Sequence, residues 1–291
     1  PPPPPPPPFQ AEDGIRDLAS SLVGSEMCIR DSPYRTRTLP VLQWASEKNP
    51  SWITDYYAAL ILWSKGKGQE ALELLEHWED SPDFIPFYYS RAHLAGIGSE
   101  QALKDMRRAL ELDPGQWRIY RDLAEIYFKK VDNGAALEIA ERGHERFPGN
   151  YILELAYSKY LTVAGDYQKS LEVLEKTHVL PFEGENTGQR LHVYNHLLLA
   201  YELYKEGQYE QALGHIDQSE LYPENLGSGA PYAPDFRDQN RLRVLIYDRT
   251  GQEALSREAE EAIRDYDLHF GERRGRSIFD QQFSTMVIQP F

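Results

Sequence analysis

The chain is poor in cysteine, has no long apolar run and carries no excess of basic charge. Its 291 residues include one cysteine, Cys28, so a disulfide within the chain is excluded. No stretch approaches the roughly 18 consecutive apolar residues of a membrane-spanning helix. The 46 acidic residues outnumber the 31 basic ones, and the net charge of −15 argues against a nucleic-acid-binding protein, which needs a basic surface. We therefore expect neither a membrane span nor a nucleic acid partner.

Motifs that carry catalysis or bind cofactors are also missing. The glycine-containing segments 64–70 (SKGKGQE) and 95–100 (AGIGSE) lack the frame of a phosphate-binding loop, so we predict no nucleotide cofactor. The acidic side chains are spaced like solvated helix faces, and we predict no catalytic residue. His192 and His196 are four residues apart, but the HVYNH segment lacks the glutamate of a zinc motif, and a third ligand would have to be Glu183 or Glu185. We predict no metal site.

The first 32 residues do not resemble natural protein sequence. After an eight-proline tract, the segments 10–17 (QAEDGIRD) and 22–31 (LVGSEMCIRD) resemble translations of two sequencing-library adapters, in the right order and frame. We exclude residues 1–32 from the fold and expect them to be disordered. The remaining 259 residues hold 41 acidic and 29 basic side chains and no cysteine, which excludes thiol nucleophiles and cysteine metal sites. The lack of cysteine fits the cytosol and the bacterial envelope equally.

Prolines in the remaining sequence recur at a nearly constant interval. They are Pro50, Pro82, Pro114, Pro148, Pro181 and Pro223, at separations of 32, 32, 34, 33 and 42 residues. Each follows an amphipathic run, and a proline just beyond a helix ends it because the ring lacks an N–H group. Two runs of helical periodicity precede each later proline, as in 151–163 and 168–177, which flank the turn 165–167. The sequence therefore predicts repeated helix pairs.

Small residues recur in phase within these predicted pairs. In the first helices they are Ala59, Ser90, Ala124, Ser158 and Ala200, and in the second helices Ala71, Ala102, Ala136, Ser170 and Ala212. Small side chains at a crossing let two helices approach within about 8–10 Å. The pattern resembles the tetratricopeptide repeat, a helix–turn–helix unit of about 34 residues. The resemblance implies an all-α fold, a right-handed superhelix of stacked helix pairs.

The expected organisation follows from the resemblance. Residues 33–266 form the array, and 267–291 form an irregular tail. The array comprises a half repeat at 38–50 and units near 51–82, 83–114, 115–148, 149–181, 191–223 and 237–266. The half repeat begins with a second helix whose first helix is missing, so we expect a fragment of a longer protein. Two insertions rich in glycine, proline and asparagine, 181–190 and 223–238, are predicted to be loops.

The two insertions carry a narrower resemblance. The segments 179–200 and 221–235 are similar to the C-terminal tetratricopeptide region of large bacterial proteins in which a carbohydrate-enzyme-like portion precedes the repeats. This resemblance implies that any catalytic part lies in sequence upstream of this chain, and it transfers no catalytic residue to it.

The resemblance to tetratricopeptide repeats also implies a binding surface, because the first helices of such superhelices line the concave face. The outward positions of these helices are Tyr56, Trp63, Arg91, Arg121, Glu125, Lys129, Lys159, Tyr194, Tyr201, Tyr204 and Lys205. Tyrosine, tryptophan and arginine are enriched where binding energy concentrates. We expect Arg121 and Lys159 to be exposed, whereas Trp63 and Tyr201 also fit a role in packing between repeats. The asparagine–lysine set that clamps peptide carboxylates in some members is missing.

The sequence is consistent with two functions. The first is a non-catalytic scaffold that binds a protein or peptide on its concave face. The second is a C-terminal structural module of a larger bacterial carbohydrate-active enzyme, whose partner is an N-terminal domain of the same chain and whose interface includes the two insertion loops.

Overall fold

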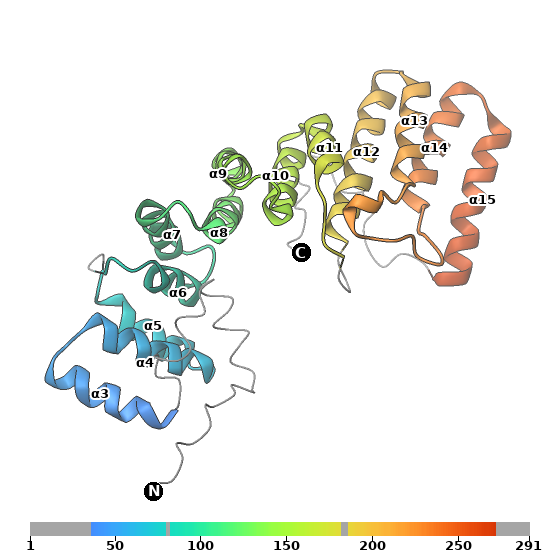
Figure 1. Cartoon of the computed structure of the whole chain (residues 1–291). Helices are drawn as coiled ribbons and strands as arrows, with labels where there is room; N and C mark the ends of the chain where they lie inside the picture. The colour runs from blue at the N-terminus through green and yellow to red at the C-terminus, as the bar shows by residue number, and fades with distance from the viewer. Residues whose placement is uncertain (1–35, 80–81, 182–185, 272–291) are drawn as a thin grey trace, which may run out of the picture. The chain divides into compact units, whose positions relative to one another are not determined.

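The computed structural model describes residues 36–79, 82–181 and 186–271, and every regular element within them is a helix (Figure 1). The adapter-like segment 1–32 lies outside the described residues. So do 272–291, which make up most of the expected tail. No helix of the described part combines the length and the apolar character that crossing a bilayer requires.

The chain divides into two compact units between Lys130 and Val131, inside the predicted repeat 115–148. The first unit contains η1 (Thr36–Thr38), α3 (Leu39–Lys48), α4 (Trp52–Ser64), α5 (Gly68–Glu76), α6 (Ile85–Ala95), α7 (Glu100–Leu112) and α8 (Trp117–Lys129). The second contains α9 (Asn133–Arg146), α10 (Tyr151–Ala164), α11 (Tyr167–Lys176), α12 (Thr187–Lys205), α13 (Tyr209–Ser219), η2 (Glu224–Leu226), α14 (Arg237–Thr250) and α15 (Glu253–Phe270).

Consecutive helices pack as pairs within each unit. In the first unit α4 packs on α5 and α6 on α7; in the second, α10 packs on α11, α12 on α13 and α14 on α15. Neighbouring pairs are also in contact: α5 packs on α6, and α11 packs on α12. A single pair leaves its apolar face open, so this stacking of pairs is what buries a continuous core.

The small residues that the sequence places at the crossings are fully buried. All ten, from Ala59 to Ala212, have an exposed fraction of 0%. A larger side chain at such a position would force the two helix backbones apart, because protein interiors are packed without spare volume. Their burial confirms the all-α helical-repeat fold.

Local signals fix where the helices begin and end. The hydroxyl of Ser99 accepts a hydrogen bond from the backbone N–H of Ala102 at 3.0 Å, which caps α7. Gly165 ends α10 with φ of 90°, a left-handed conformation that glycine adopts at little cost. Val131 stands where such a turn glycine is missing and has φ of 61°, which is strained for a β-branched residue.

The first insertion is shorter than the sequence suggests. Helix α12 begins at Thr187, inside the expected loop 181–190. Gly188 belongs to this helix and has a close neighbour. A Cβ atom at Gly188 would lie 3.3 Å from side-chain atoms of Leu226, which is buried beneath it. The glycine thus serves close packing and not a turn. Residues 182–185 lie outside the described part of the chain.

Asn225 holds the second insertion against the end of α11, in the repeat formed by α10 and α11. The side-chain amide of Asn225 donates to the carbonyl oxygens of Leu174 at 2.9 Å and Thr177 at 2.8 Å. In return, the backbone N–H of Val179 donates to the carbonyl of Asn225 at 2.8 Å. These bonds satisfy carbonyls at the end of α11 that have no partner within the helix.

The last helix pair is longer than expected. The sequence predicted a repeat near 237–266, whereas α15 continues to Phe270, four residues into the expected tail. Contacts between Arg237 and Asp267, described below, account for this extension.

Candidate functional site

The first unit places two of the expected binding residues in its interior. Tyr56 is 5% exposed, and its ring packs against those of Phe84 and Phe87 at centroid distances of 5.5 and 6.1 Å. Arg91 is 1% exposed and therefore does not face a partner. Trp63 is half-buried.

Arg91 forms a buried ion pair with Asp105, which is 0% exposed. Its Nε donates to Oδ2 of Asp105 at 2.9 Å and its Nη2 to Oδ1 at 2.7 Å, a two-pronged contact between α6 and α7. Its remaining N–H groups donate to the carbonyls of Leu75 at 3.1 Å and Glu79 at 2.8 Å, near the end of α5. The expectation that Arg91 faces outward is wrong. Its side chain points inward from α6, where it donates to Asp105 and to the two carbonyls near the end of α5.

Helix α8 presents the strongest candidate surface of the first unit. We call it the α8 surface and define it by Trp117, Arg118, Arg121 and Lys129. The guanidinium groups of Arg118 and Arg121 lie 4.6 and 5.6 Å from the centroid of the Trp117 ring. Arg121 is half-buried, with a side chain that is 40% exposed, and Lys129 is exposed. Three cations and a tryptophan thus lie along one helix of an acidic chain.

A polar cluster beneath the α8 surface links α8 to α6. The hydroxyl of Tyr89 donates to Oδ2 of Asp122 at 2.5 Å, Nε of Arg121 donates to Oδ1 at 2.6 Å, and Nε2 of His93 lies 3.4 Å from Oδ2. Burial raises the pKa of Asp122, but contacts with His93, Arg121 and Tyr89 outweigh it and leave the pKa below its usual value. Burial and the Asp122 carboxylate raise the pKa of Tyr89. The cluster keeps Asp122 ionised and holds Arg121 in one orientation.

Trp117 and Arg118 were not among the binding residues predicted from the sequence. Arg118, Arg121 and Glu125 follow one another at spacings of three and four, so they share one helix face, and this spacing was the available signal. Glu125 is half-buried on the same face.

In the second unit, Lys159 does not have the exposure that the sequence analysis expected. The residue is 7% exposed, and its ammonium lies 5.2 Å from the centroid of the Tyr160 ring. Ser158, one position earlier, approaches Ser170 within 2.7 Å, so α10 lies close to α11 at this level. A buried lysine is a poor contact for a diffusing partner.

The tyrosines of α12 are partly buried. Tyr194, Tyr201 and Tyr204 pack against the apolar core formed by α12, α13 and α14, which agrees with a packing role for Tyr201. The ammonium of Lys205 lies 5.2 Å from the Tyr201 ring centroid and 2.8 Å from Oε1 of Glu202. Lys205 is exposed, but Glu202 neutralises its charge.

A third histidine, His215, lies against His196, which in turn neighbours His192. Nδ1 of His196 lies 3.0 Å from Nδ1 of His215 on α13, and Nε2 of His192 lies 3.0 Å from the carbonyl oxygen of Gln218. Among the described residues, no group of three or more His, Cys, Asp or Glu side chains has an arrangement that holds a metal ion. The candidate third ligands Glu183 and Glu185 lie outside those residues.

The histidines make the stability of the second unit depend on pH. Burial, with the neighbouring His192 and His215, lowers the pKa of His196 to about 3, and burial lowers the pKa of both neighbours. Below pH 6.5 the unfolded chain therefore binds protons that the folded chain excludes, so stability falls as the pH falls from about 6.5 toward 3. For His196 we expect a loss of about 1–2 kcal/mol between pH 7.5 and pH 5.

Urea denaturation followed by far-ultraviolet circular dichroism measures this loss. The variant His196→Leu removes the titrating group and should show a shallower decline over the same interval. Equal unfolding free energies of the wild-type protein at pH 7.5 and pH 5 would contradict the assignment.

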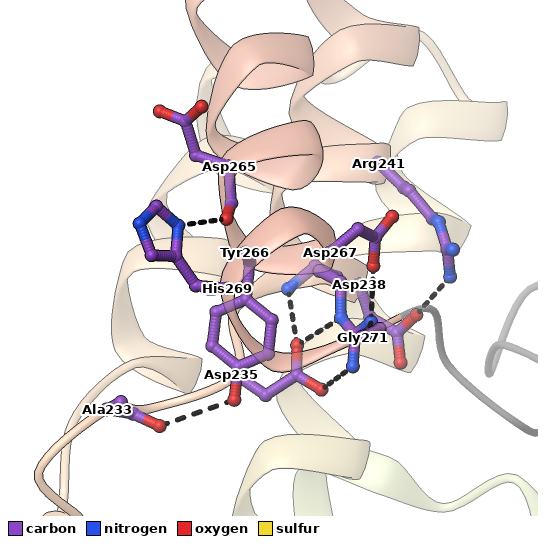
Figure 2. A network of polar contacts seen from close by, with 10 residues as sticks. Ala233, Asp235, Asp238, Arg241, Asp265, Tyr266, Asp267, His269 and Gly271 are labelled. Atoms are coloured by element: carbon purple, nitrogen blue, oxygen red, sulfur yellow. Dashed lines mark hydrogen bonds and ion pairs between the residues drawn. The ribbon is translucent and has the colours of Figure 1, made fainter.

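A second polar network fixes the start of α14 and the end of α15 (Figure 2). Arg237, 6% exposed, donates from Nε to Oδ1 of Asp235 at 2.8 Å and from Nη2 to Oδ2 at 2.7 Å. Its Nη1 donates to Oδ1 of Asp267 at 2.5 Å and to the carbonyl of Gly271 at 3.2 Å. Its guanidinium lies 4.7 Å from the Tyr266 ring centroid. The network anchors one end of the second insertion, and Asn225 anchors the other.

Comparison with known proteins agrees with this architecture. Residues 90–151 match the family model of the tetratricopeptide repeat. A search of curated proteins found no match. Among solved structures, Naa15/Naa10 bound to HypK-THB is similar with a TM-score of 0.52 and 19% identity, over 80% of this chain and 34% of that chain. YrrB, described as a TPR protein with an unusual peptide-binding site, gives a TM-score of 0.46 and 15% identity, over 62% and 91% of the two chains.

PilF of Pseudomonas aeruginosa gives a TM-score of 0.41 and 14% identity, over 80% of this chain and 95% of that chain. At 19% identity the likeness to the Naa15/Naa10 complex concerns the fold alone. Residues 90–151 match the tetratricopeptide-repeat model, and the described part of the chain is an all-α helical-repeat protein.

Proposed function

We propose that this chain is a non-catalytic scaffold that binds a protein or peptide partner on the face formed by the first helices of its repeats. The observation that carries the proposal is the α8 surface. Trp117 supplies a large amphipathic contact, and Arg118 and Arg121 supply donors beside it. Such a combination is typical of residues that dominate binding energy.

The cluster beneath the surface prepares it for binding. Arg121 is held by Asp122, which Tyr89 and His93 contact in turn from α6, so little side-chain freedom remains to be lost when a partner binds. Each rotamer-rich side chain that is immobilised costs about 0.5–1.5 kcal/mol on association, and this cost is already met in the free protein.

Arg91 and Lys159 are not part of the proposed binding face, because both side chains are buried. On the second unit, Tyr194 remains a candidate contact through its partly buried ring, 5.9 Å from the Arg190 guanidinium.

Peptides selected from a random displayed library on the full chain provide the probe. The double variant R118A/R121A is expected to weaken binding of a selected peptide at least tenfold, which corresponds to about 1.4 kcal/mol. The matched control R146A/R257A removes two exposed arginines elsewhere and should bind within twofold of the wild-type protein. Equal loss in both variants would count against the α8 surface, and unchanged melting temperatures verify folding.

A second candidate function is supported by the insertion loops. Tyr232 on the second insertion is 104% exposed, and Leu180 and Leu221, which lie just before the two insertions, are 68% and 50% exposed. Asn225 and Arg237 hold the second insertion in place. Exposed apolar side chains on a fixed loop are typical of an interface. We propose that the two loops dock another part of a longer chain, as the resemblance to carbohydrate-enzyme proteins implies. A β-rich portion encoded upstream of Tyr34 would support this role, and its absence from the genomic locus would reject it.

A further inference from the structure

Helices α9, α10 and α11 of the second unit enclose an open groove of about 370 Å³. Second helices of two consecutive repeats, α9 and α11, form its walls, and α10 contributes Tyr157. The groove is thus formed mainly by second helices and shares no residue with the α8 surface. Its volume is at the lower end of the range of ligand pockets and suffices for one or two amino-acid side chains.

The negative charge of Glu141, inside the groove, is already balanced by contacts within the protein. Oε1 of Glu141 accepts a hydrogen bond from the Tyr157 hydroxyl at 2.7 Å and from Nζ of Lys169 at 3.1 Å. These two contacts hold the pKa of Glu141 below its usual value, so its charge is satisfied within the protein. The His144 ring stacks on Tyr157 at 5.0 Å with an interplanar angle of 21°. Tyr157 is 3% exposed and the Lys169 ammonium lies 5.3 Å from its ring centroid, so the half-buried His144 ring is the aromatic surface that the groove offers.

The rim of the groove, by contrast, carries more acidic than basic charge. Glu145 on α9 and Glu172 on α11 line the groove, both are exposed, and neither forms an ion pair or side-chain hydrogen bond within the described part of the chain. Four glutamates and two lysines line the groove in total, and one of the lysines, Lys176, is exposed on α11. The two rim carboxylates on opposite walls complement one cationic side chain, whose charge they flank while its aliphatic stem lies on the His144 ring.

We infer that the α9–α11 groove binds an arginine or lysine side chain of a basic peptide segment in a partner protein. The site is separate from the α8 surface, so the chain would hold two partners, or two segments of one partner, at once. A guanidinium is the better fit, because it donates to both carboxylates and stacks on an aromatic ring.

The test uses the full chain and a fluorescein-labelled peptide of twelve residues in which arginine and alanine alternate. Its affinity is measured by fluorescence anisotropy at 150 mM salt, and a peptide of alternating glutamate and alanine serves as the negative probe. The double charge reversal E145K/E172K is expected to weaken binding of the arginine peptide at least tenfold.

Because the whole chain is acidic, the control must reproduce the change in net charge. The variant E258K/E261K reverses two exposed glutamates on α15 and should bind within twofold of the wild-type protein. Equal weakening in both variants, or no binding of the arginine peptide to the wild-type protein, would overturn the proposal. The variant R118A/R121A should bind this peptide normally, which keeps failure of the groove distinct from failure of the α8 surface.

Discussion

Replacing Arg237 with methionine is expected to lower the free energy of unfolding of the second unit by about 1.5–3 kcal/mol. The substitution removes the shared partner of Asp235 and Asp267. It also removes the stacking contact with Tyr266 and the donor to the carbonyl of Gly271. Asp235 and Asp267 are 34% and 29% exposed, so water partly solvates them in the variant and the loss stays below that for a fully buried pair.

The two units can be followed separately in this experiment. All five tryptophans lie in the first unit, so tryptophan fluorescence reports on that unit, whereas circular dichroism reports on both. In urea, R237M should move the dichroism transition of the second unit and leave the fluorescence transition in place. The exposed-arginine variant R257M is the control, with an expected change within about 0.5 kcal/mol. Similar effects of R237M and R257M would show that the network contributes little.

Replacing Asp105 with alanine is expected to destabilise the first unit by about 3–5 kcal/mol. The variant leaves Arg91 charged, 1% exposed and without its carboxylate, with two backbone carbonyls as the remaining hydrogen-bond acceptors and the Phe87 ring 5.0 Å away. The tryptophan fluorescence transition should shift to lower urea concentration, and the dichroism change of the second unit should be unaffected.

The double variant R91M/D105L separates the cost of an unpaired charge from the worth of the pair. Apolar residues of similar volume often replace a buried ion pair with little loss, so the double variant is expected to be more stable than D105A. A double variant as unstable as D105A would mean that the carbonyls near the end of α5 depend on Arg91 for their hydrogen bonds.

Sequence periodicity predicted the helix pairs because small residues at the crossings are a local pattern. Ala59 and Ser158 could be placed from spacing alone, and both are 0% exposed. The direction of a long side chain depends on carbonyls or carboxylates that other helices supply. Arg91 turned inward to reach α5 and α7, and no pattern in its own helix indicates this.

The candidate sites were predicted only in part for the same reason. Arg121 was found from its position on a first helix, whereas Trp117 was missed because it stands in the first turn of α8. The Arg237 network joins residues about 30 positions apart, and the α9–α11 groove joins three helices. Gly188 was misread as a loop residue, because a glycine required for close packing and a glycine required for a turn look alike in sequence.

The central claim is that a partner binds on the α8 surface, and amide hydrogen exchange with and without a selected peptide tests it most directly. A bound peptide should slow exchange in residues 117–129 and in the facing part of α6, while α13 to α15 exchange as in the free protein. Protection confined to the second unit, with exchange in α8 unchanged at saturating peptide, would contradict the account.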